Sequence, residues 1–302
     1  MRTTRIENTA LQVDVLPDFG ARVVRLVDKV SGRDWMASGG VSDNVAEGAV
    51  YSVAEAIGWD ECFPTVSTGD GETPGWGRRL RDHGDVWGRP WHVDRETPTC
   101  LATTYLGREF EFSRSLELLG ATLTAHYTVR NTGSSDLPYL WAMHGLLAIG
   151  TEDRIVMRGV KRVAGAYLTL GGRQFAATVL DWPGPSATYP VALDQIQPAS
   201  SAIAAKLYAT ALPSRSVAVG RAGQWLDIAW DDSIDDLGIW ATYGGWPAPG
   251  GTHQLALEPT TASADGVDDA IARGAAIWLK PRDVREWTIR LSVSSGAQAE
   301  RM

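Results

Sequence analysis

Alternation of hydrophobic and polar residues with a period of two is the main pattern along the chain. In ATLTAHYTVRN, residues 121–131, hydrophobic side chains take every second position and polar side chains take most of the positions between them. Such alternation is typical of a β-strand that buries one face. The positions predicted to be buried are Leu123, Ala125, Tyr127 and Val129, and those predicted to be exposed are Thr122, Thr124, His126, Thr128 and Arg130.

Neighbouring segments extend this strand into an antiparallel sheet. EFEFSRSLEL, residues 109–118, precedes it through a short turn at Leu119 and Gly120, and the turn cluster NTGSSDLP follows it. YLWAMHGLLAI, residues 139–149, then continues as extended chain. LQVDVLPDFGARVVRLVD, residues 11–28, predicts a hairpin near the start, and residues 275–293 predict two strands around the turn KPRD.

Helical patterns are scarce. Only DGVDDAIARGAA, residues 265–276, favours one short helix or turn, and no internal repeat, heptad or low-complexity linker marks a domain boundary. We therefore predict an all-β fold in a single domain spanning residues 1–302, a large antiparallel β-sandwich of two sheets. The open concave face of one sheet would provide a cleft.

Composition and charge limit the classes of partner. A formal net charge of -8 argues against nucleic acid, because phosphate binding needs clustered lysine and arginine. The two cysteines, Cys62 and Cys100, lack metal or redox spacing, and no apolar signal core or long uncharged apolar run occurs. We expect a cytoplasmic protein without membrane contact, monomeric or homodimeric. Nucleotide, zinc and hydrolase motifs are missing from the sequence, so no cofactor or metal is predicted.

Tryptophan is unusually frequent, with thirteen residues against five phenylalanines. An indole ring at a partly wet surface suits the C–H face of a sugar, and its N–H group can still donate a hydrogen bond. The alternative for each ring is packing in the core of a large β protein. The tryptophans that border glycine, proline or charge are Trp59, Trp76, Trp87, Trp91 and Trp246.

Two of the five histidines, His83 and His144, are each followed by glycine. A missing side chain beside a histidine lets a ligand or another backbone come close. His92 and His126 are expected at the surface, and His253 lies at the start of a strand. The alternative for His144, on an apolar strand face, is a buried structural residue.

Three carboxylates are candidates for a site. Glu258 shares one strand face with Gln254 and Ala256, opposite Leu255 and Leu257, and the following proline holds the chain extended. Such a firmly held carboxylate can act as a general base, and a cap or a surface charge is the alternative. Asp60 and Glu61 lie between Trp59 and Phe63, where strand alternation sends one of the two carboxylates inward. The basic run RRLR, which ends at Arg81, is either a solvated loop or a clamp for an anionic group.

Taken in order, four stretches resemble the galactose mutarotase-like superfamily, and within it the aldose 1-epimerase (mutarotase) group. They are GWDECFPTV with its acidic pair, RDHGDVWGRPW with the first His-Gly, LWAMHGLLAI with the second, and LALEPTTA with the glutamate. The resemblance covers roughly residues 10 to 293. The chain departs from the best-known members at Asp82, where they have asparagine, and in GLLAIG after the second histidine.

The resemblance implies a β-sandwich with a sugar cleft and gives each candidate residue a role. His144 would be the general acid, Glu258 the general base, and His83 a partner of the ring oxygen or a hydroxyl. Asp60 or Glu61, together with Arg81 and Trp87, would hold sugar hydroxyls.

Mutarotation makes chemical sense of these residue types. Opening the sugar ring requires a base at the C1 hydroxyl and an acid at the ring oxygen, and both groups must work in two protonation states. Histidine, with an ordinary pKa of about 6.5, and glutamate, of about 4.3, suit these roles without a cofactor.

Several alternatives remain open from the sequence alone. One is a glycosidase or polysaccharide lyase on a similar scaffold that pairs Glu258 with Asp60 or Glu61, and another is a non-catalytic sugar-binding module. A hexose-phosphate mutarotase, with arginines of the basic run around the anionic group, falls within the main hypothesis.

Overall fold

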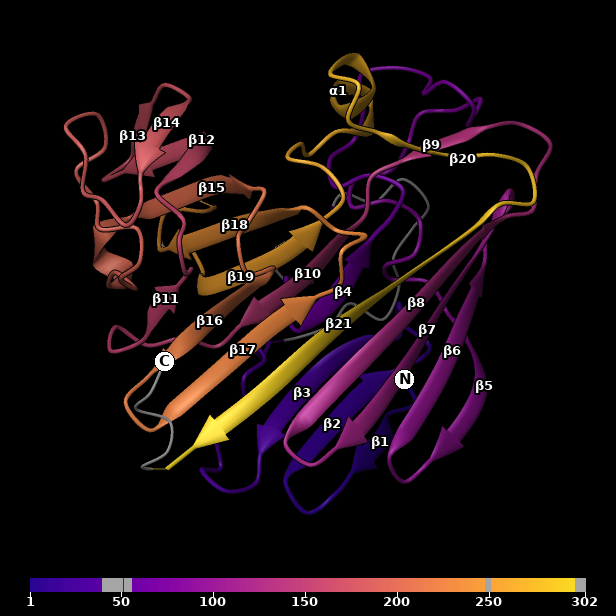
Figure 1. The fold of residues 1–302 in the computed structure, drawn as a ribbon, viewed down its shortest axis with the longest axis horizontal. Helices are drawn as coiled ribbons and strands as arrows, with labels where there is room; N and C mark the ends of the chain where they lie inside the picture. The colour runs from indigo at the N-terminus through magenta and orange to yellow at the C-terminus, as the bar shows by residue number, and fades with distance from the viewer. Residues whose placement is uncertain (40–50, 52–55, 248–250, 297–302) are drawn as a thin grey trace.

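The computed structural model describes residues 1–39, 51, 56–247 and 251–296, and this part of the chain forms two large antiparallel sheets (Figure 1). The larger sheet has 11 strands among the described residues. Their order is β1 (Thr4–Glu7), β2 (Leu11–Leu16), β3 (Arg22–Asp28), β4 (Trp59–Cys62), β10 (Ala142–Leu147), β19 (His253–Thr260), β18 (Asp236–Tyr243), β15 (Ile203–Thr210), β12 (Arg162–Leu170) and β13 (Arg173–Phe175), with β14 (Thr178–Asp181) also paired to β12.

The second sheet of the described chain has 8 strands. Their order is β11 (Arg154–Val156), β16 (Ser216–Arg221), β17 (Gln224–Trp230), β21 (Val284–Ser295), β8 (Thr122–Asn131), β7 (Phe110–Leu119), β6 (Cys100–Leu106) and β5 (His92–Thr97). A short pair, β9 (Leu137–Tyr139) with β20 (Ile277–Leu279), lies near helix α1 (Val267–Ala272) at one end of the molecule (Figure 1). Residues Ala199–Ser201 form a single 3-10 turn. Within the described chain, no helix is long and apolar enough to span a membrane.

Strand pairing confirms the expected hairpins. β7 and β8 pair across the predicted turn, with Leu119 opposite Thr122, and β2 pairs with β3. The short helix expected in residues 265–276 is α1. The two strands expected near the C-terminus also form, but they do not pair with each other, because β20 joins β9 and β21 joins β8.

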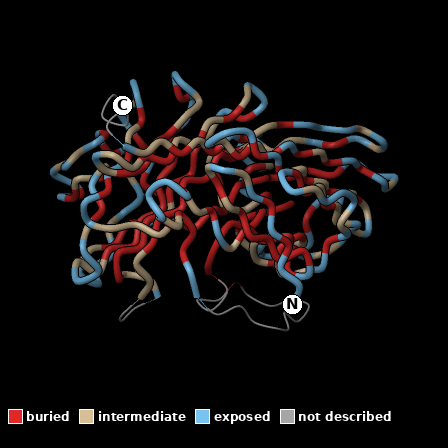
Figure 2. Tube along the Cα trace, turned by 90° about the horizontal axis from the view of Figure 1, so that it is seen from below, coloured by how far each residue is buried: buried red, intermediate tan, exposed pale blue. Residues whose placement is uncertain are grey.

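The hydrophobic core lies between the two sheets. The alternating face of β8 is buried as predicted, with Leu123 and Val129 fully covered, and Leu255 and Leu257 of β19 enter the same core cluster from the larger sheet. Figure 2 shows the buried residues gathered in the interior, with exposed positions at the loops around them. Each large apolar side chain buried in this way stabilises the fold by about 1.5–3 kcal/mol.

Because alternate residues of a strand point to opposite faces, the larger sheet has a second face that is not used by the sandwich core. Four central strands of that sheet, β10, β19, β18 and β15, present polar or aromatic side chains on this second face. These side chains are His144, Glu258, Trp240 and Lys206, and all four line one pocket.

Candidate active site

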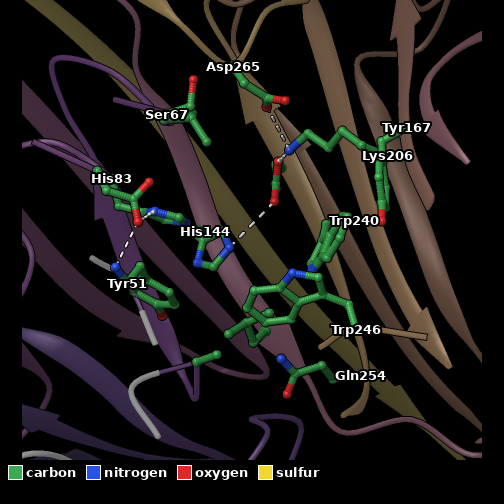
Figure 3. A pocket seen from close by; sticks show the side chains of 15 residues that line it. Tyr51, Ser67, His83, His144, Tyr167, Lys206, Trp240, Trp246, Gln254 and Asp265 are labelled. Carbon is green, nitrogen blue, oxygen red and sulfur yellow. Dashed lines mark hydrogen bonds and ion pairs between the residues drawn. The ribbon is translucent and has the colours of Figure 1, made fainter. Parts of the chain in front are cut away.

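The pocket on the second face of the larger sheet has a volume of about 520 Å³, which is within the usual range for a small-molecule site. Strands supply its floor, and segments before and after them supply its walls (Figure 3). Its lining residues include Tyr51, Val66, Ser67, Asp82, His83, His144, Tyr167, Lys206, Trp240, Trp246, Gln254, Glu258 and Asp265.

His144 and Glu258 face each other across neighbouring strands. β10 pairs with β19 so that Ala142 lies opposite Thr260 and Leu146 opposite Ala256, which places the two residues between these pairs side by side. The Nε2 atom of His144 is 3.8 Å from Oε1 of Glu258, and both side chains are almost fully buried. The structure therefore brings together the two residues for which the resemblance implies acid and base roles.

The environment of His144 favours its neutral form. Burial, together with nearby His83, Lys206 and Arg22, holds the pKa of His144 well below its ordinary value. Its Nδ1 atom is buried without a hydrogen-bond partner among the described residues. At neutral pH the imidazole is therefore mostly uncharged.

Glu258 is 1% exposed and lies on the pocket face of β19, as the sequence alternation predicts. Its Oε2 atom accepts a hydrogen bond from the ammonium group of Lys206, whereas Oε1 has no hydrogen-bond partner among the described residues. Burial raises the pKa of Glu258, and the charge of Lys206 opposes that rise. One carboxylate oxygen is thus anchored and the other is available.

His83 reaches the same pocket from the segment that follows β4. Its ring stacks on Tyr51 at 4.1 Å between centroids and lies 5.0 Å from the ring of His144. Its Nδ1 atom is 3.3 Å from Oδ2 of Asp82. The first His-Gly segment and the second therefore contribute to one site.

The glycines after the two histidines make room for protein atoms. Gly84 has a φ of +76°, and a Cβ atom there would lie 2.0 Å from the carbonyl oxygen of Phe63. At Gly145 a Cβ atom would lie 3.0 Å from the side chain of Met143. Close approach of another backbone therefore explains Gly84, whereas the near atom at Gly145 is only the end of the flexible Met143 side chain.

Asp60 lies behind the pocket rather than in its lining. It sits opposite His144 in the register of β4 with β10 and is fully buried. The carboxylate forms an ion pair with Arg22 and accepts a hydrogen bond of 3.0 Å from the hydroxyl of Tyr51. Asp60 therefore holds Tyr51, which in turn stacks on His83.

Glu61 points to the opposite face of β4 and lies between the two sheets. Its carboxylate accepts hydrogen bonds from Arg114 at 2.8 Å, Tyr127 at 2.9 Å and Trp141 at 3.0 Å. Burial raises the pKa of Glu61 to about 7, even though these donors act in the other direction. Of the two adjacent carboxylates, Glu61 is the one that the strand sends into the core, so it does not contact the pocket.

Arg81 and Trp87 also lie outside the pocket lining and instead shape the segment that carries His83. The Trp87 indole is fully buried and donates a 2.7 Å hydrogen bond to the carbonyl of Asp82. The Arg81 guanidinium lies 4.0 Å above that ring and donates to the carbonyl of Trp87. Elsewhere in the basic run, Arg78 pairs with Asp85 and Arg79 bonds the carbonyl of Gly69, so none of the three arginines lines the pocket.

Sequence reasoning missed several of the lining residues. Of the five tryptophans that border glycine, proline or charge, only Trp246 lines the pocket, and it lies 5.7 Å from Trp240. The other four tryptophans are buried, because they pack in the core or beneath the segment that carries His83. Lys206 was also missed, although a single lysine in the otherwise uncharged strand IAAKLYAT was a usable signal.

Among the described residues, one group has the composition of a metal site. Cys62, His83 and His144 each bring one ligand atom within 4.8 Å of the others. Burial and the carboxylates nearby raise the pKa of the Cys62 thiol well above its usual value, and a neutral thiol is a poor metal ligand. The protonated thiol therefore does not suit this group to hold a metal ion.

Comparisons with known proteins agree on the fold. No family model and no curated protein sequence matches the chain. Solved structures match over nearly its whole length. A protein from Escherichia coli K12, provisionally named an aldose 1-epimerase, has a TM-score of 0.72 at 16% identity, over 98% of this chain and 99% of that one.

Two further structures from lactobacilli match in the same way. The galactose mutarotase related enzyme of Lactobacillus acidophilus has a TM-score of 0.67 at 16% identity, covering 97% of this chain and 98% of that one. A galactose mutarotase-like protein of Lactobacillus casei ATCC 334 has a TM-score of 0.70 at 16% identity, covering 97% and 100%. The chain therefore has the galactose mutarotase-like β-sandwich fold, and the resemblance inferred from its sequence is confirmed at the level of the fold.

Proposed function

We propose that this protein is an aldose 1-epimerase, which interconverts the α and β anomers of a sugar. The observation that carries the proposal is the facing pair of His144 Nε2 and Glu258 Oε1, 3.8 Å apart in a pocket that also holds His83. The aromatic wall of Trp240 and Trp246 supports a sugar ligand, because indole faces pack against C–H groups.

The proposed reaction needs one proton shared between the two groups. Glu258, through Oε1, removes the proton of the C1 hydroxyl while His144, in the fraction of molecules in which it is imidazolium, protonates the ring oxygen. The C1–O5 bond breaks, the open-chain aldehyde rotates about C1–C2, and ring closure returns both protons. Each group of this kind contributes about 10²- to 10⁴-fold to the rate.

The geometry favours this activity over the alternatives. A binding module without catalysis predicts that His144 and Glu258 are too far apart to contact one sugar, whereas they are neighbours. A glycosidase would pair Glu258 with Asp60 or Glu61. However, Asp60 is held by Arg22, and Glu61 lies between the two sheets. The three arginines of the basic run do not line the pocket, so they give no support to a phosphorylated substrate.

The test follows freshly dissolved α-anomers of several neutral and anionic aldoses by polarimetry or anomeric-proton NMR, with buffer alone as the blank. We expect acceleration that falls by at least about 100-fold in Glu258→Gln and in His144→Asn. His92→Asn, at a side chain that is 75% exposed, is the matched control and should keep full activity. Near-wild-type rates in either pocket variant would refute the role given to that residue.

A further inference from the structure

Lys206 is a buried cation in the centre of a strand. It lies on β15, is 6% exposed, and is the only charged residue of that strand. A buried ammonium group is costly unless it is paired. Here Nζ contacts Oε2 of Glu258 and lies 3.5 Å from Oδ1 of Asp265. Figure 3 marks the ion pair of Lys206 with Asp265 by a dashed line. The carboxylates, chiefly that of Glu258, outweigh the effect of burial and raise the pKa of Lys206, so it stays charged.

The contact between Lys206 and Glu258 spans an intervening strand. β18 lies between β15 and β19, and Gly238 of β18 sits directly opposite Glu258. A Cβ atom at position 238 would lie 2.8 Å from Oε2 of Glu258 and 3.5 Å from Nζ of Lys206. The missing side chain therefore leaves the space in which the ion pair forms.

The ion pair divides the two oxygens of Glu258. Oε2 is held by Lys206, and Oε1 faces His144 with no hydrogen-bond partner among the described residues. We propose that Lys206 is a positioning residue that holds the base by Oε2 and keeps Oε1 directed at the anomeric hydroxyl. This inference rests on the proposed function and extends it, because it assigns a role to a residue for which the resemblance gave none.

The same contact sets the charge balance of the site. Among the described residues, the ionisable groups that surround Glu258 are His144, His83, Cys62, Lys206, Asp265 and Tyr208. Lys206 lowers the pKa of Glu258 and also that of His144, whereas Asp265 raises the pKa of Glu258. Without Lys206 the buried carboxyl would hold its proton to higher pH and would be a base in a smaller fraction of molecules.

The experiment measures kcat/KM for mutarotation against pH in the 302-residue protein. In Lys206→Met we expect both limbs of the profile to move to higher pH, by about 1–3 units, because an opposite charge at contact distance has an effect of that size. Lys206→Arg keeps the charge and should keep the limbs near their wild-type positions. Asp265→Asn should move the acidic limb the other way, to lower pH. Lys161→Met, at an exposed lysine, is the matched control.

A second variant and a second readout separate this role from a structural one. Gly238→Ala keeps Lys206 but should displace Oε2 from it, and it should move the limbs in the same direction as Lys206→Met. The pKa of the Glu258 carboxyl, measured by carbon-13 NMR in the folded wild type and in either variant, does not depend on activity. An upward shift supports the inference, and an unmoved pKa and unmoved limbs overturn it. If the wild type fails to accelerate mutarotation on any sugar, the proposed function fails, and the NMR shift still decides whether Lys206 controls Glu258.

Discussion

Glu61 makes the stability of the protein depend on pH, and Glu61→Gln is the substitution that should reveal it. The carboxyl has a pKa of about 7 in the folded chain, against 4.5 in its usual state. Below the lower value the carboxyl is protonated in both the folded and the unfolded chain, so it does not make the free energy of unfolding depend on pH. Between the two values the unfolded chain releases the proton while the folded chain keeps it, so stability falls as pH rises, until above about pH 7 the folded chain also carries the carboxylate.

The size of this loss follows from the two pKa values. At about 1.36 kcal/mol for each pKa unit, the wild type should lose about 3 kcal/mol of unfolding free energy from this group between about pH 4.5 and pH 7. With about 2.1 cal/mol/K of unfolding entropy per residue over 302 residues, this corresponds to about 5 °C in Tm. Glu61 is fully buried, so solvent does not screen the effect.

Denaturant unfolding at about pH 5 and about pH 8 provides the assay. Glu61→Gln also removes the acceptor of one hydrogen bond, the bond that Trp141 donates. The loss of this hydrogen bond lowers the stability of the variant at both pH values. The informative quantity is therefore the difference between the two pH values, which should be about 2.5 kcal/mol smaller in the variant than in the wild type, because a small part of the loss has already occurred at about pH 5. Glu117→Gln, at an exposed position of β7, is the control. Parallel pH curves for wild type and Glu61→Gln would refute the reasoning.

Two predictions concern activity. Burial lowers the pKa of His144, so the form of the enzyme in which His144 and Glu258 together carry one proton should be lost as pH rises. The optimum of kcat/KM should therefore lie on the acid side of neutrality. An activity that stays maximal well above neutral pH would contradict this. Trp240→Ala should raise KM about 10-fold with a smaller change in kcat, because it removes stacking area and no proton carrier. Trp278→Ala, at a ring that is 43% exposed and outside the pocket, should leave both constants unchanged, and equal behaviour of the two variants would contradict a sugar-stacking role.

Local pattern determined much of this protein. Alternation in β8 predicted which side chains are buried, and alternation in β19 predicted that Gln254 and Glu258 share one face, which is the face that lines the pocket. The order of the two His-Gly segments and the glutamate strand pointed to the galactose mutarotase-like fold. These features depend on the geometry of one strand or on the order of segments, both of which are present in a linear sequence.

Tertiary structure decided how the residues are combined. Alternation required that Asp60 and Glu61 point to opposite faces of β4. Which of the two points inward was decided only by the packing of β4 against the second sheet, where Arg114 donates a hydrogen bond to Glu61. Likewise, Lys206 meets Glu258 only because β15, β18 and β19 are neighbours and Gly238 leaves the space between them. Contacts of this kind arise from strand order and side-chain packing between distant segments, which the period of hydrophobic residues along one strand does not contain.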